Sequence, residues 1–333
     1  MRSFAEGGYR RARPDLRPAS LTQILLAVDL LELWHGGAVY CDQLCRDFLL
    51  DFRAWRLATR PLPPCTEHRQ AMRLLGGTRY RCPVKACPAT AAYVAAVGHA
   101  TANKNVRTLV ALWYEAVDQG LNPHTSKERI RPLKEELDNL PCWEPGDFSK
   151  ILASCRVEPR IEELPCDAGA FWFALLLTVY DTGSRISAIM DCTPADLDWQ
   201  AKTLTLRAGT TKSRKCQVMG LSDQTLEAIR AISDPARGYL FPWPFGRAKR
   251  DWRTLRTRYK SILQRAGLPK SKIHLFHKVR RTTATELVLA GGLAAAREHL
   301  GHSAESVTKR YIDRRRLDST QRNARLLPRP RTD

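Results

Sequence analysis

The first candidates for chemistry lie in the segment GHSAESVTKRYID, residues 301–313. This segment places His302 nine positions before Tyr311, and several arginines follow. A tyrosine hydroxyl can act as a nucleophile, but a pKa of about 10 leaves it protonated and weakly reactive at neutral pH. A histidine can exchange or orient protons in that pH range. A nucleophilic phenol at this position therefore needs further groups from elsewhere in the chain.

Four short segments resemble the motifs of the tyrosine recombinase (phage integrase) family, in order and approximate spacing. They are TGSRIS (182–187), HKVRRTTATEL (277–287), LGHS (300–303) and RYI (310–312). The resemblance covers roughly residues 141 to 320. It implies a DNA breaking and joining enzyme, with a mixed α/β catalytic domain behind a helical core-binding domain. The two domains would clamp a DNA duplex.

The resemblance also implies a set of catalytic residues. Carried over onto this sequence, it gives two arginines, a hairpin lysine, two histidines and the nucleophile: Arg185, Arg280, Lys212, His277, His302 and Tyr311. Lys215 competes with Lys212 for the lysine position. Two positions depart from the family pattern. Ala188 stands where an acidic residue is frequent, and Arg281 stands where histidine is common.

These residue types suit the cleavage of a phosphodiester. Such a group passes through a five-coordinate state with added negative charge, and arginine offers a planar fork of permanent donors to its oxygens. Arg185 and Arg280 could clamp both non-bridging oxygens, and Lys212 could protonate the departing 5′ oxygen. A tyrosyl ester preserves the bond energy for rejoining, so we expect neither metal, ATP nor any other cofactor in the reaction.

The net charge of the chain favours a polyanionic partner. Lys and Arg number 54 against 34 Asp and Glu among 333 residues, a net charge of +20. The chain remains basic without its arginine-rich ends, which favours double-stranded DNA over a lipid surface. The longest apolar run, residues 171–180, is too short to span a bilayer. We therefore expect a cytoplasmic, nucleoid-associated protein with no membrane partner.

Helical periodicity dominates the first half of the chain. Apolar residues predict one helix from Ser20 to about Trp34 and another over 101–124. The second of these helices carries Lys104 and Arg107 on a polar face, where we expect them to contact DNA together with Lys215 and Arg281. The charged stretch 126–141 ends in proline and indicates a linker.

The second half mixes helices with a small sheet. Residues 171–180 predict a buried helix, and the alternation of apolar and polar residues in 202–221 predicts a β-hairpin that carries the candidate lysines. We expect a mainly α fold with a small β-sheet, in which an α+β catalytic domain and a helical N-terminal domain form a two-domain clamp. The expected parts are a basic tail (1–18), the core-binding domain (19–139), the catalytic domain (140–320) and a second basic tail (321–333).

Ten cysteines in an intracellular chain of this length indicate reduced thiols rather than a disulfide framework. Cys65-x2-His68 followed by Cys82-x4-Cys87 has a spacing that zinc tolerates. Scattered small buried thiols explain the same pattern more simply. We therefore expect no metal, with zinc at these four residues as the alternative.

The sequence favours a site-specific recombinase that serves integration or excision of a mobile element, as a homotetramer on paired DNA sites. A type IB topoisomerase uses a similar set of Arg, Lys, His and Tyr to relax supercoils and is the nearest alternative. The third possibility is an accessory DNA-binding protein without catalysis, for which Ala188 and Arg281 are the only support in the sequence.

Overall fold

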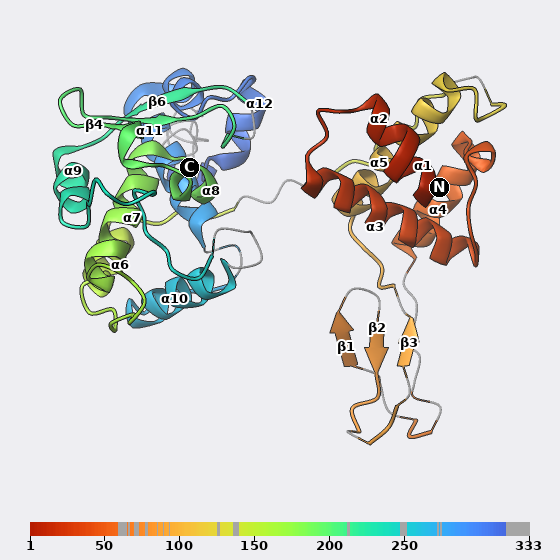
Figure 1. Ribbon diagram of the computed structural model, residues 1–333, viewed down its shortest axis with the longest axis horizontal. Coiled ribbons are helices and arrows are strands. Elements are labelled where there is room, and N and C mark those ends of the chain that lie inside the picture. Colours follow the sequence, from red (N-terminus) through yellow and green to blue (C-terminus); the bar gives the residue numbers. More distant parts are fainter. Residues whose placement is uncertain are drawn as a thin grey trace, which may run out of the picture. The chain divides into compact units, whose positions relative to one another are not determined.

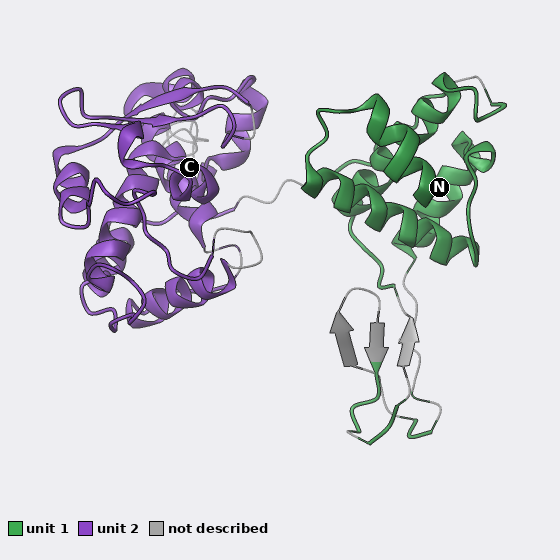
Figure 2. Ribbon diagram, viewed as in Figure 1, with its two compact units in different colours: residues 1–136 green, residues 137–333 purple. Residues whose placement is uncertain are grey.

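The computed structural model describes residues 1–58, 65, 67–69, 73–76, 79–84, 86–88, 90–92, 94–124, 127–135, 140–211, 214–246, 252–271, 273 and 275–317. The chain divides into two compact units, Met1–Glu136 and Leu137–Asp333 (Figures 1 and 2). The division falls inside the stretch 126–141, whose sequence indicates a linker. None of the helices in the described ranges is both long and apolar enough to cross a membrane.

The first unit is helical apart from one small sheet. Its helical elements are α1 (Arg2–Phe4), the π-helix η1 (Ala5–Tyr9), α2 (Arg10–Ala12), α3 (Pro18–His35), the 3-10 turn η2 (Cys41–Gln43), α4 (Arg46–Leu57) and α5 (His99–Asp118). Between α4 and α5 the chain forms strands β1 (Arg73–Gly76), β2 (Arg79–Arg81) and β3 (Thr90–Ala92), which pair antiparallel in that order. The sequence pattern predicts no elements for this part of the chain.

The first twelve residues are folded, which corrects the expectation of a basic tail over 1–18. They form three short helical segments, and Phe4 and Tyr9 are buried in the same core as Leu31 and Trp113. The N-terminal ammonium of Met1 donates a hydrogen bond to a backbone carbonyl. The expectation rested on arginine content alone and was wrong, because the apolar residues between the arginines supply enough surface for burial.

Helix α5 has the two faces that its sequence predicts. Val106, Leu109 and Trp113 are buried in the core of the first unit, whereas Lys104 and Arg107 are exposed. The Nζ atom of Lys104 donates to the side-chain oxygen of a glutamine on α3 at 2.6 Å. The basic face therefore lies in solvent, available to an anionic partner.

The second unit packs helices around a three-stranded sheet. Its helices are α6 (Pro145–Cys155), α7 (Ala168–Thr182), α8 (Ile186–Met190), α9 (Asp223–Arg230), α10 (Trp252–Arg265), α11 (Phe276–His299, interrupted at Gly292) and α12 (Glu305–Thr308), with 3-10 turns η3 (Pro194–Asp196), η5 (Lys309–Tyr311) and η6 (Arg314–Arg316). Strands β4 (Leu197–Asp198), β5 (Thr203–Leu206) and β6 (Gln217–Gly220) are antiparallel and neighbour one another in that order. The mainly helical fold with a small sheet and the hairpin over 202–221 confirm the predictions (Figure 1).

An aromatic core anchors the helix that carries the candidate catalytic arginine. The ring of Trp172 on α7 stacks on Tyr259 of α10 and on Phe276, with centroids 6.0 Å and 6.4 Å away. Phe276 is the first residue of α11, so this stack fixes the start of that helix one turn before Arg280. Burial of such large rings contributes strongly to the stability of the unit.

Candidate active site

Three of the candidate residues meet in one cluster inside the second unit. The guanidinium NH2 of Arg280 lies 2.7 Å from Nε2 of His302. The ring of Tyr311 faces the His302 ring with centroids 5.1 Å apart, and the guanidinium carbon of Arg280 lies 4.9 Å from the centre of the Tyr311 ring. The two contacts of Arg280 join segments more than twenty residues apart, and they place a phenol beside a permanent cation.

The protonation states of His302 and Arg280 favour the binding of an anion at this cluster. Burial, together with the positive charges of Arg280 and Arg185, lowers the pKa of His302 to about 4. Burial lowers the pKa of Arg280 to about 10, although the neighbouring Tyr311 opposes the shift. His302 is therefore neutral and Arg280 remains charged at neutral pH, so the site carries a net positive charge before any substrate binds.

Three hydrogen bonds tie α11 to the end of α7 and so fix the position of Arg280. Arg280 donates to the carbonyl of Gly183, Thr283 donates to the carbonyl of Tyr180 at 2.6 Å, and a ring nitrogen of His299 lies 2.8 Å from the carbonyl oxygen of Asp181. Gly183 ends α7 in the left-handed region, with φ of 55°. That conformation favours glycine and turns the chain toward Arg185.

Arg185 and Arg280 line the same small cavity. Arg185 is the N-cap residue of α8, two residues after the turn at Gly183. Side chains from β5, from the following loop and from the start of β6 close the cavity, which is also lined by Ser184, Ala188, Leu206, Thr210, Thr211 and Gln217. The Nε atom of Arg280 is buried without a hydrogen-bond partner among the described residues. A buried, unpaired guanidinium donor is costly, and an oxygen of a bound phosphate would satisfy it.

The remaining candidates are Lys215, His277 and Lys212. Lys215 is exposed and lines an open pocket that also contains His302 and Gly301. His277 lies in the first turn of α11, three residues before Arg280, with an exposed side chain. Lys212 lies outside the described residues, so its assignment as the catalytic lysine stays a prediction.

A buried aspartate holds the segment that carries Tyr311, and its role was not predicted from the sequence. The backbone amide of Asp313 donates to Oγ1 of Thr285 at 3.0 Å, and the carboxylate of Asp313 accepts from the amide of Cys142 at 3.1 Å. Burial acts to raise the pKa of Asp313, but hydrogen bonds from Arg315 and from backbone amides outweigh it and lower the pKa to about 2. The sequence held one signal for this role, which is that Asp313 lies two residues after Tyr311.

Arg281 does not occupy the position that we expected. Its side chain is buried, Nε donates to the carbonyl of Pro141 at 3.0 Å, and NH2 donates to the carbonyl of Ile273. The prediction of a DNA contact at Arg281 was therefore wrong, because its donors already bind backbone carbonyls inside the protein. Ala188, the other departure from the family pattern, is buried on α8.

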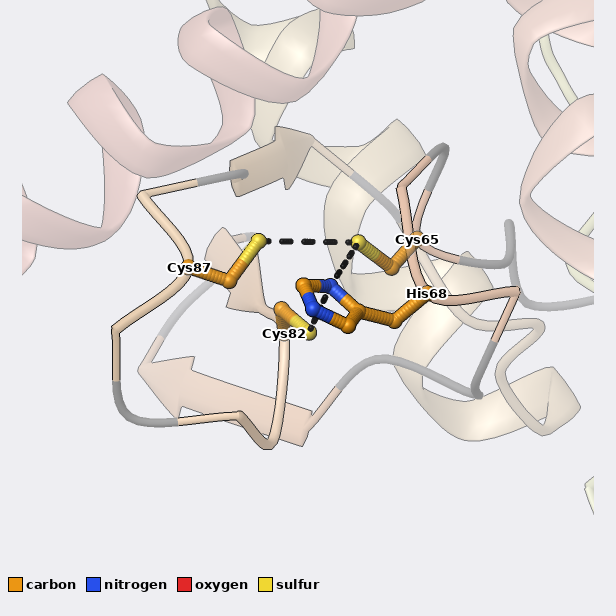
Figure 3. A group of neighbouring side chains, drawn as sticks. All are labelled: Cys65, His68, Cys82 and Cys87. Atoms are coloured by element: carbon orange, nitrogen blue, oxygen red, sulfur yellow. Dashed lines mark hydrogen bonds between the residues drawn. The ribbon is translucent and has the colours of Figure 1, made fainter.

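The interpretation of Cys65, Cys82 and Cys87 as scattered thiols was also wrong. The structure gathers them with His68 into one cluster, in which the four potential ligand atoms lie within 4.8 Å of one another (Figure 3). This cluster belongs to the first unit, and the geometry around Tyr311 does not include it.

Comparison with protein families finds a match within the second unit. Residues 160–317 match the model of the phage integrase family. A tyrosine recombinase XerC-like protein of Caldanaerobacter subterraneus subsp. tengcongensis is 27% identical over 240 residues, which cover 58% of this chain and 56% of that protein. The matched region is thus little more than half the length of that relative.

Two solved structures share the fold over nearly the whole chain. One is the Tn1549 transposon integrase in complex with circular intermediate DNA, at 16% identity and a TM-score of 0.62, covering 97% of this chain and 99% of that one. The other is a lambda integrase dimer bound to a COC′ core site, at 13% identity and a TM-score of 0.58, covering 94% and 96%. At these identities the likeness establishes the fold.

Proposed function

Since residues 160–317 belong to the phage integrase family of tyrosine recombinases, we propose that this protein cuts and rejoins DNA strands through a covalent bond between Tyr311 and a 3′ phosphate. The structural relatives are a transposon integrase in complex with circular intermediate DNA and a lambda integrase bound to a core site. By analogy with them, we assign the protein to the integration or excision of a mobile element.

In the proposed reaction, Oη of Tyr311 attacks the phosphorus of a phosphodiester and the bond from phosphorus to the 5′ oxygen breaks. The phenolic proton passes to His277, and Lys212 supplies a proton to the departing 5′ oxygen. Attack by the 5′ hydroxyl of a second strand on the phosphotyrosyl ester then restores the phosphodiester and frees Tyr311. Because one ester replaces another at each step, the sequence needs no external energy source.

The observation that carries this proposal is the contact set between Arg280, His302 and Tyr311. His302 already accepts a hydrogen bond from Arg280 and its ring faces the phenol, so we assign it to positioning. The unpaired Nε of Arg280 then donates to a non-bridging oxygen, and Arg185 across the shared cavity takes the other.

We further propose that basic residues of both units bind the DNA backbone. Lys104 and Arg107 on α5 and Lys215 after β5 are exposed cations that suit phosphate contacts. An exchange of two duplexes requires four strand cuts, and each chain holds one Tyr311. We therefore propose a homotetramer on paired sites, acting in the cytoplasm on nucleoid DNA.

A suicide duplex tests the proposal directly. The duplex, taken from DNA that flanks the gene, carries a nick placed so that the fragment released by cleavage diffuses away. We expect a protein–DNA adduct that survives SDS with the wild type and none with Tyr311→Phe. Tyr239→Phe is the matched control, because Tyr239 is an exposed tyrosine of the same unit, and it should keep the adduct.

The products of the reaction on DNA distinguish a recombinase from a topoisomerase and from an accessory DNA-binding protein. Reciprocal exchange between two sites supports recombination, whereas relaxation of plasmid supercoils by a DNA-bound monomer supports the topoisomerase alternative. Salt-sensitive binding with no adduct on any flanking DNA would instead favour an accessory DNA-binding protein. An adduct that persists in Tyr311→Phe contradicts the assignment of the nucleophile.

A further inference from the structure

The cysteine and histidine cluster of the first unit lies at one end of the β1–β2–β3 sheet. The first residue of β1 lies opposite the last residue of β2, which lies opposite the first residue of β3. Cys65 and His68 precede β1, Cys82 directly follows β2, and Cys87 precedes β3. The antiparallel register therefore brings all three segments to the same end, and Figure 3 shows their side chains pointing toward a common centre.

The spacing of the ligand atoms matches the edges of a tetrahedron around zinc. Bonds of about 2.3 Å to sulfur and about 2.0 Å to nitrogen set edges of about 3.8 Å between two sulfurs and about 3.5 Å between sulfur and nitrogen. The Sγ atoms of Cys65 and Cys87 are 3.7 Å apart, and Nδ1 of His68 lies 3.8 Å from Sγ of Cys65 and 3.7 Å from Sγ of Cys82. These three spacings agree with a tetrahedral zinc site, and all four ligand atoms lie within 4.8 Å of one another.

Among the side chains that the structure describes around this sheet, the buried ones are mainly the ligand candidates themselves. The buried side chains described between residues 65 and 92 are those of Cys65, Cys82 and Cys87, with Val84 partly buried against them. They form a cluster separate from the helical core of the first unit. Segments shorter than about 40 residues usually need a disulfide or a metal to fold, because they bury too little apolar surface.

The geometry excludes a disulfide as the element that holds the sheet together. The 3.7 Å between Sγ of Cys65 and Sγ of Cys87 is well beyond a sulfur–sulfur bond of about 2.05 Å, and the cysteines of the cluster form no disulfide. We propose that Cys65, Cys82 and Cys87, as thiolates, and Nδ1 of His68 bind a zinc ion that holds the sheet together. Three sulfurs and one nitrogen in a tetrahedron select zinc, and four protein ligands leave no open position, so the site is structural.

Metal analysis of the full chain tests this site. The protein is purified with a thiol reductant and without chelator, and its metal content is measured by inductively coupled plasma mass spectrometry. We expect about one zinc per chain in the wild type and a loss of most of it in Cys82→Ser and His68→Ala. His68→Cys should retain the ion, because a fourth thiolate is also a zinc ligand.

Two variants serve as matched controls. Cys45→Ser removes a cysteine of the same unit that lies outside the cluster and should keep the zinc. Glu67→Gln changes a carboxylate that accepts from Cys87 Sγ at 3.2 Å but does not belong to the ligand set, so it should also keep the zinc. Loss of the ion from Glu67→Gln would overturn the assignment of the four ligands.

A measurement on the wild type guards against variants that fail to fold. Removal of zinc with a chelator should make three thiols newly reactive toward a thiol reagent, and added zinc should protect them again. Replacement by cobalt should give the intense visible bands of a tetrahedral site together with thiolate charge transfer. Three outcomes would overturn the proposal: no zinc bound after its addition, unchanged thiol reactivity, or eight rather than ten free thiols in denatured protein that was purified without a reductant.

Discussion

Nδ1 of His302 lies 3.0 Å from Oγ1 of Thr308, three residues before Tyr311. The guanidinium of Arg280 can only donate hydrogen bonds, so Nε2 of His302 must accept, and the ring proton of neutral His302 resides on Nδ1. That proton is donated to the hydroxyl oxygen of Thr308. Arg280 and Thr308 thus fix the tautomer and the ring orientation of His302, the histidine that faces the phenol of Tyr311.

The protonation of His302 provides the first prediction. Its pKa in the folded protein is lowered to about 4 by burial and by Arg280 and Arg185, against an ordinary value of 6.5. Between these values the unfolded chain binds more protons than the folded one, so this histidine reduces stability as pH falls from about 6.5 to about 4. Nitrogen NMR should find the neutral Nδ1–H form at pH 7 and at pH 5. A titration midpoint near 6.5 would contradict the lowered pKa of His302, and a neutral form protonated on Nε2 would contradict the tautomer assignment.

Thr308→Val tests the role of the hydroxyl in orienting His302. Thr308 is fully buried, and valine keeps its shape while it removes the hydrogen-bond partner of Nδ1. We expect strand cleavage on the suicide duplex to slow by roughly tenfold, equivalent to one hydrogen bond of about 1.4 kcal/mol, with DNA affinity unchanged. Thr178→Val, which removes a buried hydroxyl bonded to a helix carbonyl on α7, is the control and should cleave at the wild-type rate.

Gly183→Ala should destabilise the second unit and misplace Arg280. A Cβ at this left-handed residue would lie 2.7 Å from a methyl carbon of Leu300 and 3.1 Å from Cγ2 of Thr283. Backbone strain costs about 1–2 kcal/mol, and the overlap with packed side chains adds about 1–3 kcal/mol. Urea unfolding followed by tryptophan fluorescence measures the loss.

Gly267→Ala isolates the backbone part of that cost. Gly267 also has a positive φ, of 69°, but a Cβ added there would meet no heavy atom of the described residues within 4 Å. We expect this variant to lose only about 1–2 kcal/mol of unfolding free energy. Equal losses of unfolding free energy in Gly183→Ala and Gly267→Ala would show that Leu300 and Thr283 move aside without an energetic penalty.

Asp313→Asn should loosen the segment that carries Tyr311. The pKa of this buried carboxyl is lowered to about 2 from 3.8, because hydrogen bonds from Arg315 and backbone amides outweigh burial. Its contribution to stability is therefore present above about pH 4 and lost as pH falls toward 2. At pH 7 we expect Asp313→Asn to lower the free energy of unfolding by about 1–3 kcal/mol. At pH 3 the difference in unfolding free energy between the variant and the wild type should be smaller.

An exposed ion pair provides the comparison for Asp313. Asp223 lies 2.6 Å from Nζ of Lys202, but both side chains are more than half exposed. Asp223→Asn should lower the free energy of unfolding by at most about 1 kcal/mol, because solvent screens the ion pair. If Asp313→Asn proves equally mild, the buried carboxylate is not what holds the segment that carries Tyr311 in place.

The order of the motifs indicated the family whose model matches residues 160–317, and apolar periodicity determined α3, α5, α7 and the hairpin of β5 and β6. Both depend on residues that lie near one another in the chain, where a spacing of two or of three to four residues fixes which side chains share a face. The candidates Arg280, His302 and Tyr311 followed from the motifs, and the structure brings them together.

The environment of each side chain was decided only by the tertiary structure. Arg281 and Arg280 are adjacent and of the same type, yet one binds backbone carbonyls of Pro141 and Ile273 and the other lines the cavity shared with Arg185. Likewise, the spacing of the cysteines offered zinc at Cys82 only as the alternative to scattered thiols, and antiparallel pairing places the three segments at one end of a sheet. Burial and hydrogen bonding arise between segments separated by many residues, and neither composition nor local spacing specifies which of them meet.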